Sequence, residues 1–197
     1  MRNKKILYIG LGIIIIVIVI IGIIYYWQNK ETNKTELNNQ ENLVNLNEEN
    51  LYNKNFGSYT ILDGWIESKE HSTRNKFFYV KKGQEQYETP NNISVNVGTN
   101  KYAENEHEKF KTAILNQLSM QIGNSQDITI NATGSNTENG YILYTFSVHE
   151  PEVETIQYYI VGDYKYVLVH ETIFDNDGKN ETDNAAKEII NSFKWKE

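Results

Sequence analysis

The N-terminal segment constrains this chain more than any other part, because it contains an uninterrupted apolar run. Residues 6–27 read ILYIGLGIIIIVIVIIGIIYYW, which is 22 residues without a charge. As an α-helix this run is about 33 Å long and matches the hydrocarbon core of a bilayer. A helix that is apolar on every side has no polar face to offer water, which argues against a buried helix of a soluble protein. We therefore predict a single transmembrane helix over residues 6–27, with the lipid bilayer as its partner.

The residues that flank this run predict its orientation. Arg2, Lys4 and Lys5 precede it without an acidic residue among them, and residues 25–27 (YYW) end it with aromatic side chains typical of a membrane interface. Residues 1–5 are therefore expected in the cytoplasm and the rest of the chain outside the cell membrane, as a single-pass protein. A cleaved signal peptide is the alternative, although its apolar region usually spans about 7–15 residues and ends in small residues. The first alanine of this chain is Ala103.

Composition limits the kind of protein that follows the apolar run. The chain has 197 residues, two prolines and no cysteine, so we expect one folded domain without disulfides, thiolate nucleophiles or CxxC zinc sites. Residues 28–197 hold 16 of the 19 basic residues and all 26 acidic ones, a net charge of −10. This acidic balance disfavours nucleic acid as a partner.

Residues 28–56 differ in composition from what precedes and follows them. This stretch contains ten asparagines, many charges and no periodic apolar face of useful length. We predict a flexible Asn-rich stalk, about 30 Å from end to end on average. Leu43, Leu46 and Leu51 leave open a short amphipathic helix within it.

The remaining residues, 57–197, predict an extracytoplasmic domain that folds alone. Its apolar residues alternate as in strands over 57–62, 76–83, 91–99, 127–132, 141–150, 153–162 and 164–174. Apolar residues three and four apart predict a helix over 104–122, and a second helix is expected to begin at Asn180 as its cap. Gly162-Asp163 is the expected hairpin turn, and residues 133–140 the expected loop. We predict an α+β fold in which helices pack on the faces of an antiparallel sheet.

The order of these segments resembles the PsbP-like family. The resemblance covers residues 57–195 and is carried by LDGW (62–65), FKTAILNQL (110–118), GYILYTF (140–146), YYIVGDYKYVLV (158–169) and AKEIINSFKW (186–195). The family includes the extrinsic P subunit of the photosystem oxygen-evolving complex and bacterial secreted or membrane-anchored proteins. The resemblance implies an α-β-α sandwich that serves as a binding or assembly module and not as an enzyme.

Two histidine-carboxylate pairs, His149-Glu150 and His170-Glu171, are the main candidates for chemistry. The expected turns place His170 opposite Thr155, and Thr155 opposite Ser147. Both histidines would then lie at the same end of the sheet with one strand between them, about 9.6 Å apart. Metal bonds near 2 Å would strain such an arrangement, and no third ligand is visible. We therefore interpret both pairs as polar residues at a sheet end. No catalytic, cofactor or metal residue is predicted, and no cofactor is expected.

The other two histidines, His71 and His107, lie in polar surroundings and are expected on the surface. The sequence favours a membrane-tethered extracytoplasmic binding or assembly module of unknown ligand, with a protein or another envelope component as partner. The alternative is an extracytoplasmic hydrolase or metal-dependent enzyme with an unrecognised site.

Overall fold

The structure, a computed structural model, describes residues 50–123 and 127–197. The predicted cytoplasmic residues 1–5, the transmembrane helix 6–27 and the first 22 residues of the stalk lie outside the described residues. Within the two described ranges, neither helix has the length and apolar character needed to cross a membrane.

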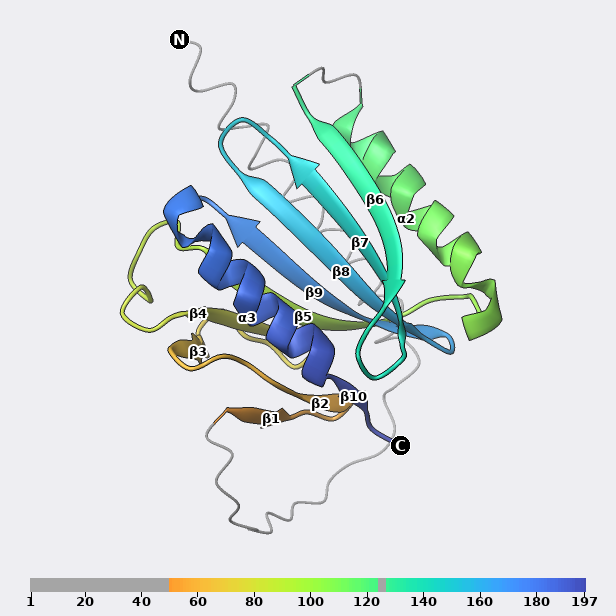
Figure 1. Ribbon diagram of the computed structural model, residues 1–197, viewed down its shortest axis with the longest axis horizontal. Helices are drawn as coiled ribbons and strands as arrows, with labels where there is room; N and C mark the ends of the chain where they lie inside the picture. The colour runs from red at the N-terminus through yellow and green to blue at the C-terminus, as the bar shows by residue number, and fades with distance from the viewer. Residues whose placement is uncertain (1–49, 124–126) are drawn as a thin grey trace. The chain divides into compact units, whose positions relative to one another are not determined.

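Two antiparallel sheets form the framework of the domain (Figure 1). The larger sheet has the strand order β3-β4-β5-β9-β8-β7-β6, and the smaller has the order β1-β2-β10. The elements are, in chain order, β1 (Leu51–Asn53), β2 (Gly57–Thr60), β3 (Trp65–Glu67), β4 (Lys76–Lys81), β5 (Asn92–Thr99), η1 (Glu104–Glu106), α2 (His107–Ile122), β6 (Thr129–Asn136), β7 (Ile142–His149), β8 (Glu154–Gly162), β9 (Lys165–Ile173), η2 (Asn176–Gly178), α3 (Lys179–Ser192) and β10 (Lys194–Trp195).

The two longer helices pack on opposite faces of the larger sheet, so the predicted α+β fold and its α-β-α layering are confirmed. Alternate residues of one strand point to opposite faces. On β8, Tyr158 and Ile160 join the core under α3, whereas Tyr159 and Val161 join the core under α2. The expected apolar stripe of the last helix is also confirmed, because Ala186, Ile189, Ile190 and Phe193 are all buried.

The turn between β8 and β9 differs from the expected one by a residue. Gly162 pairs with Lys165, so Asp163 and Tyr164 form the turn, and Tyr164 has a φ of 54°. Gly162 is the last residue of β8, and a Cβ there would lie 3.2 Å from the Trp195 indole. Gly162 therefore leaves space for the Trp195 ring of β10. The local sequence around the turn does not reveal this contact.

The smaller sheet shows that the folded part begins before Gly57. β1 lies in the segment expected to be stalk, and Tyr52 pairs with Tyr59 of β2. The Tyr52 ring stacks on Tyr59 and meets the edge of Tyr79, while Lys54 forms an ion pair with Glu67 at 3.0 Å. These contacts with distant residues hold 51–53 as a strand, which also excludes the alternative helix through Leu51.

Two further boundaries differ from the expected ones. β6 continues to Asn136 because residues 133–136 pair with β7, so the predicted loop shrinks to the turn before Tyr141. The last helix begins at Lys179 with Gly178 at its N-cap, and the Thr182 hydroxyl donates to the Gly178 carbonyl. Asn180 is thus inside the helix and does not cap it.

Candidate functional site

The two histidine-carboxylate pairs do not come together. His149 pairs with Glu154, whereas His170 pairs with Gln157, which in turn pairs with Phe146. His149 and Phe146 are three residues apart on β7, so their side chains point to opposite faces of the sheet. The expected register, with His170 opposite Thr155 and Thr155 opposite Ser147, is therefore wrong. Both turns lie at slightly different residues than the sequence indicated.

Glu171 is a core residue and not a polar residue at a sheet end. It is 0% exposed and lies on the face of β9 that packs against α3, close to Tyr158 and Asp183. Within residues 50–123 and 127–197, neither carboxylate oxygen of Glu171 has a hydrogen-bond partner. Burial, together with a smaller effect of the nearby Asp183, raises the pKa of Glu171 to about 9. The sequence indicated this burial, since Glu171 lies at the same alternate positions of the strand as the apolar residues Val167, Val169 and Ile173.

His170 lies on the opposite face of the sheet, beside Ser94 of β5. Burial lowers the pKa of His170 to about 4, and the positive charge of Lys76 contributes to this shift. Its Nε2 atom has no hydrogen-bond partner among the described residues. The imidazole is therefore neutral at physiological pH.

His107 has structural partners instead of standing free on the surface. Its Nδ1 lies 2.6 Å from the Tyr144 hydroxyl, and that hydroxyl donates to Glu108 Oε1 at 2.7 Å. Because the single hydroxyl proton is used for Glu108, a neutral His107 donates its Nδ1 proton to Tyr144 and keeps Nε2 as the basic nitrogen. The chain of bonds fastens the start of α2 to β7. His71, by contrast, is exposed as expected and contacts the Phe78 ring edge.

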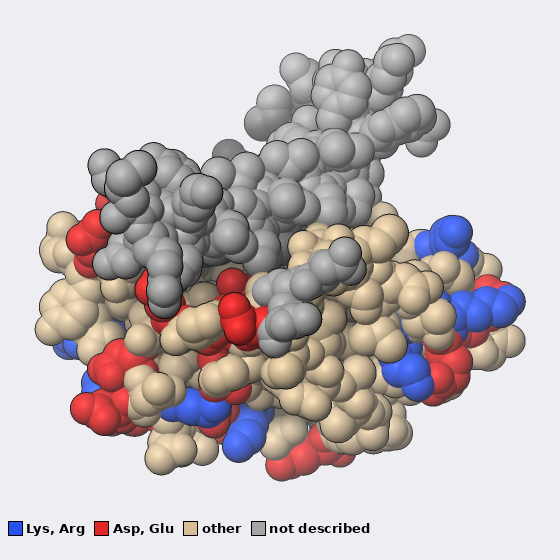
Figure 2. Space-filling view, turned by 90° about the horizontal axis from the view of Figure 1, so that it is seen from above, with Lys and Arg blue, Asp and Glu red and all other residues tan. Residues whose placement is uncertain are grey.

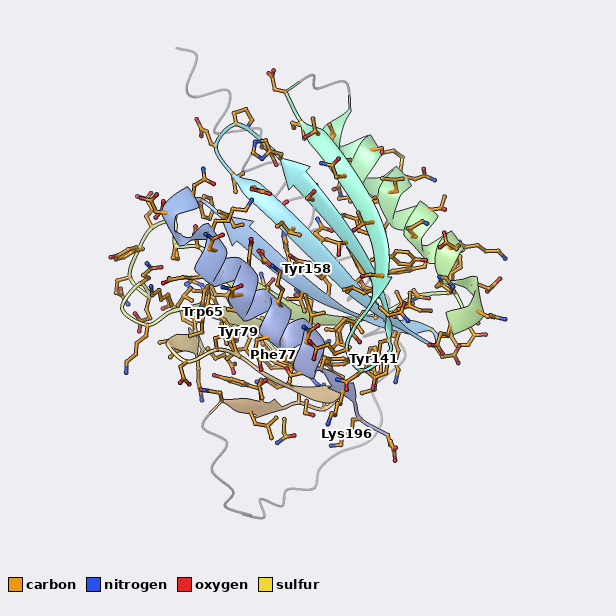
Figure 3. The ribbon with its side chains drawn as sticks, in the orientation of Figure 1. Trp65, Phe77, Tyr79, Tyr141, Tyr158 and Lys196 are labelled. Carbon is orange, nitrogen blue, oxygen red and sulfur yellow. The ribbon has the colours of Figure 1, made fainter. Side chains whose placement is uncertain are left out.

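A small cleft opens where β3 and β4 meet the start of α3. Its volume is about 60 Å³. Trp65 is 6% exposed and forms part of its wall, while Tyr87 is 61% exposed. Figure 3 shows Trp65, Tyr79 and Phe77 in a row beside α3. The lining residues are Trp65, Lys81, Gln84, Tyr87, Thr89, Pro90, Asn91, Asp175, Gly178, Glu181 and Thr182.

Asn91 holds the two sides of this cleft together. Its Oδ1 accepts from the backbone N–H groups of Phe174 and Asp175, both at 2.8 Å, and its Nδ2 donates to the Asp175 carbonyl at 2.7 Å. A Cβ at position 178 would lie 2.8 Å from Asn91 Nδ2, so Gly178 makes room for this amide. These bonds fix the loop after β4 against the start of α3.

The charges around the cleft are asymmetric. Lys81 forms an ion pair with Glu181, and both side chains are substantially exposed. Asp175 accepts from the Asp177 N–H and adds a second carboxylate. With one lysine and two carboxylates, the cleft carries a net negative charge beside the rings of Trp65 and Tyr87. Such a site suits a cationic group that can also stack on an aromatic face.

The cleft was not predicted from the sequence, since its residues come from three separate segments and match no motif. No group of three or more histidine, aspartate or glutamate side chains within residues 50–123 and 127–197 is arranged to hold a metal ion.

Comparison with known proteins finds similarity at the level of structure. No family model matches the chain, and no curated protein matches it. It is similar to cyanobacterial PsbP (CyanoP) from Synechocystis sp. PCC 6803, with a TM-score of 0.47 and 13% identity over 80% of this chain and 98% of that one. It is also similar to the Ran-binding protein Mog1p from Saccharomyces cerevisiae, with a TM-score of 0.45 and 12% identity over 70% of this chain and 89% of that one. Both similarities concern the fold alone.

Proposed function

We propose that this chain is a membrane-tethered, extracytoplasmic binding module whose cleft beside α3 receives an arginine side chain of a protein partner. The observation that carries the proposal is the cleft itself, with an aromatic wall at Trp65, an exposed ring at Tyr87 and two carboxylates at Asp175 and Glu181. Arginine combines a planar cation that stacks on rings with donors that match carboxylates.

The size of the cleft favours a side chain over a free small molecule. Sites for small ligands usually measure about 300–1,000 Å³, several times the 60 Å³ found here. A space of this size fits one side-chain head group, and buried arginine and aromatic anchors dominate many protein interfaces. The proposal is therefore one of protein assembly without catalysis.

Charge also supports a basic partner. The region after the apolar run has a net charge of −10, which attracts a cationic segment at a distance. In Figure 2, acidic and basic side chains are intermixed on the part of this face that described residues form, and no continuous basic surface of the kind nucleic acid requires is seen among them.

The location outside the membrane rests on the apolar run and its flanking charges. If residues 6–27 span the bilayer, residues 28–49 act as a flexible tether about 26 Å long on average. That length keeps the cleft within reach of other proteins of the same membrane. Protease added to sealed spheroplasts is expected to remove the domain, and full protection would reverse this orientation.

Photo-crosslinking in intact membranes tests the cleft directly. A photoreactive phenylalanine analogue replaces Tyr87 in one variant and Tyr164, which is 54% exposed at the β8–β9 turn, in the matched control. We expect an adduct from position 87 only, with an arginine in the crosslinked peptide of the partner, and loss of the adduct in the Asp175→Asn/Glu181→Gln variant. Equal adducts from both positions, or an adduct that survives the double substitution, would refute the proposal.

A further inference from the structure

β6 leaves one edge of the larger sheet open. Thr129–Asn136 pairs with β7 along its whole length on one side. On the other side, none of the described residues forms a hydrogen bond with the backbone of this strand. An unpaired edge of this length presents a row of N–H and C=O groups that can accept another strand.

The usual protections of an edge strand are missing from β6. Its sequence, TINATGSN, contains no charge and no proline, and all its residues except Ile130 are exposed. The opposite edge is protected, because β3 has three residues and its Glu67 is paired with Lys54. The glycine of this strand, Gly134, does not protect the edge, since its role is to make room for the Tyr144 ring of β7. The unprotected edge is therefore a specific property of β6.

We infer that β6 pairs antiparallel with β6 of a second copy of this chain, so that two sheets join into one across a two-fold axis at Thr133. In this register Thr133 lies opposite Thr133 of the second copy, Asn131 opposite Ser135, and Ala132 opposite Gly134. Hydroxyl and amide side chains meet one another on one face, which favours cross-strand pairing. The small residues meet on the face covered by α2.

The lack of charge on β6 allows a second copy of this acidic chain to be its occupant. Two acidic domains repel each other over most of their surfaces, but this uncharged strand lets them approach without opposing carboxylates. A two-fold axis makes the same patch complementary to itself, which is the commonest symmetry of protein dimers. A single strand pair gives an interface at the small end of the known range, so the association is expected to depend on concentration.

The absence of cysteine provides a clean test. Thr133→Cys places two thiols directly opposite each other, at a Cβ separation of about 4.5–5.5 Å. Thr129→Cys is the matched control, since it changes the same residue type on the same strand and face but separates the thiols by about 27 Å. The full chain in detergent micelles is oxidised mildly, and the disulfide-linked dimer is followed on a non-reducing gel.

We expect Thr133→Cys to crosslink at least tenfold faster than Thr129→Cys. Adding Asn131→Lys and Ser135→Lys places like charges opposite each other and should slow the Thr133→Cys crosslink at least tenfold. Adding Asn55→Lys and Asn184→Lys should leave the rate unchanged, because both residues are exposed and lie outside the larger sheet, Asn55 between β1 and β2 and Asn184 on α3. Equal rates for the two cysteine variants, no crosslink in either, or insensitivity to the edge lysines would overturn the inference. None of these results depends on the cleft.

Discussion

At the scale of single residues, Glu171 shows how register creates a buried acid. It shares the inward face of β9 with Val167, Val169 and Ile173, and α3 covers all four. Removing a carboxylate from water disfavours its charged form, so the group stays protonated at neutral pH. His170, the next residue back along the strand, points the other way and stays neutral because burial disfavours its charged form too.

The two residues predict opposite responses of stability to pH. Glu171 has a pKa of about 9 in the folded state against an ordinary 4.5, so between these values it is protonated in the folded state and ionised in the unfolded state. The free energy of unfolding therefore falls as pH rises over this range, by at most about 1.4 kcal/mol per unit. His170 has a pKa of about 4 against an ordinary 6.5, so stability falls as pH drops between those values. The two slopes cancel between about pH 4.5 and 6.5, and stability should decline from pH 6.5 to 9.

Urea unfolding of the wild type and of Glu171→Gln across pH 5–8.5 tests this prediction. The amide keeps the shape without the ionisation, so Glu171→Gln should be level above pH 6.5. Because the wild type loses at most about 1.4 kcal/mol per unit from pH 4.5 upward, the variant should be more stable than the wild type at pH 8 by at most about 5 kcal/mol. Glu152→Gln, at an exposed position, is the control. A wild-type stability that rises above pH 7 would contradict the assignment.

At the scale of elements, β10 and the β8–β9 hairpin depend on each other. Trp195 lies against Gly162, and the Lys165 amine lies 4.4 Å from the Trp195 ring. The hairpin is also held from outside, because the Tyr164 N–H donates to the Tyr102 carbonyl at 3.0 Å. A tertiary contact therefore selects the turn residues.

Gly162→Ala is expected to destabilise the domain by about 1–3 kcal/mol, because the added methyl group lies too close to the Trp195 indole, which must shift to make room. Combining it with Trp195→Phe should recover part of this loss, since the smaller ring leaves space. Chemical denaturation of the single and double variants gives the coupling energy. Strictly additive losses would show that the contact does not decide the turn.

The elements that could be predicted from the sequence are those with a regular apolar period. Strands β4, β5, β7, β8 and β9 and both long helices lie close to their expected ranges. The short strands β1, β3 and β10 could not be predicted, since three residues or fewer carry no period and are held by distant partners. The cleft depends on the same kind of contact, through Asn91 and Asp175.

At the scale of the whole molecule, residues 48–197 form one compact unit. The sequence placed the start of the domain at Gly57, but β1 adds the Tyr52 ring to Tyr59 and Tyr79, whose hydroxyls lie 2.6 Å apart in the core. Lys54 also lies 3.8 Å from the centre of the Phe77 ring. The segment entering the domain is thus part of its core.

A chain of residues 48–197 is therefore expected to be soluble and to melt cooperatively. A chain of residues 57–197 should be less stable by about 2–4 kcal/mol, because it loses the Tyr52 packing and leaves Glu67 without its partner. Calorimetry of both chains measures the difference. Equal stability of the two chains would show that residues 50–56 do not contribute to the folded domain.

Recognition of arginine by the cleft is the central claim, and mapping by NMR tests it most directly. The chain in detergent micelles is titrated with a blocked Gly-Arg-Gly peptide and with the same peptide carrying neutral citrulline. The account predicts shifts confined to Trp65, Gln84, Thr89 and Asn91 with the arginine peptide, none with citrulline, and their loss in Asp175→Asn/Glu181→Gln. Shifts scattered over the acidic surface, or equal shifts with both peptides, would contradict it.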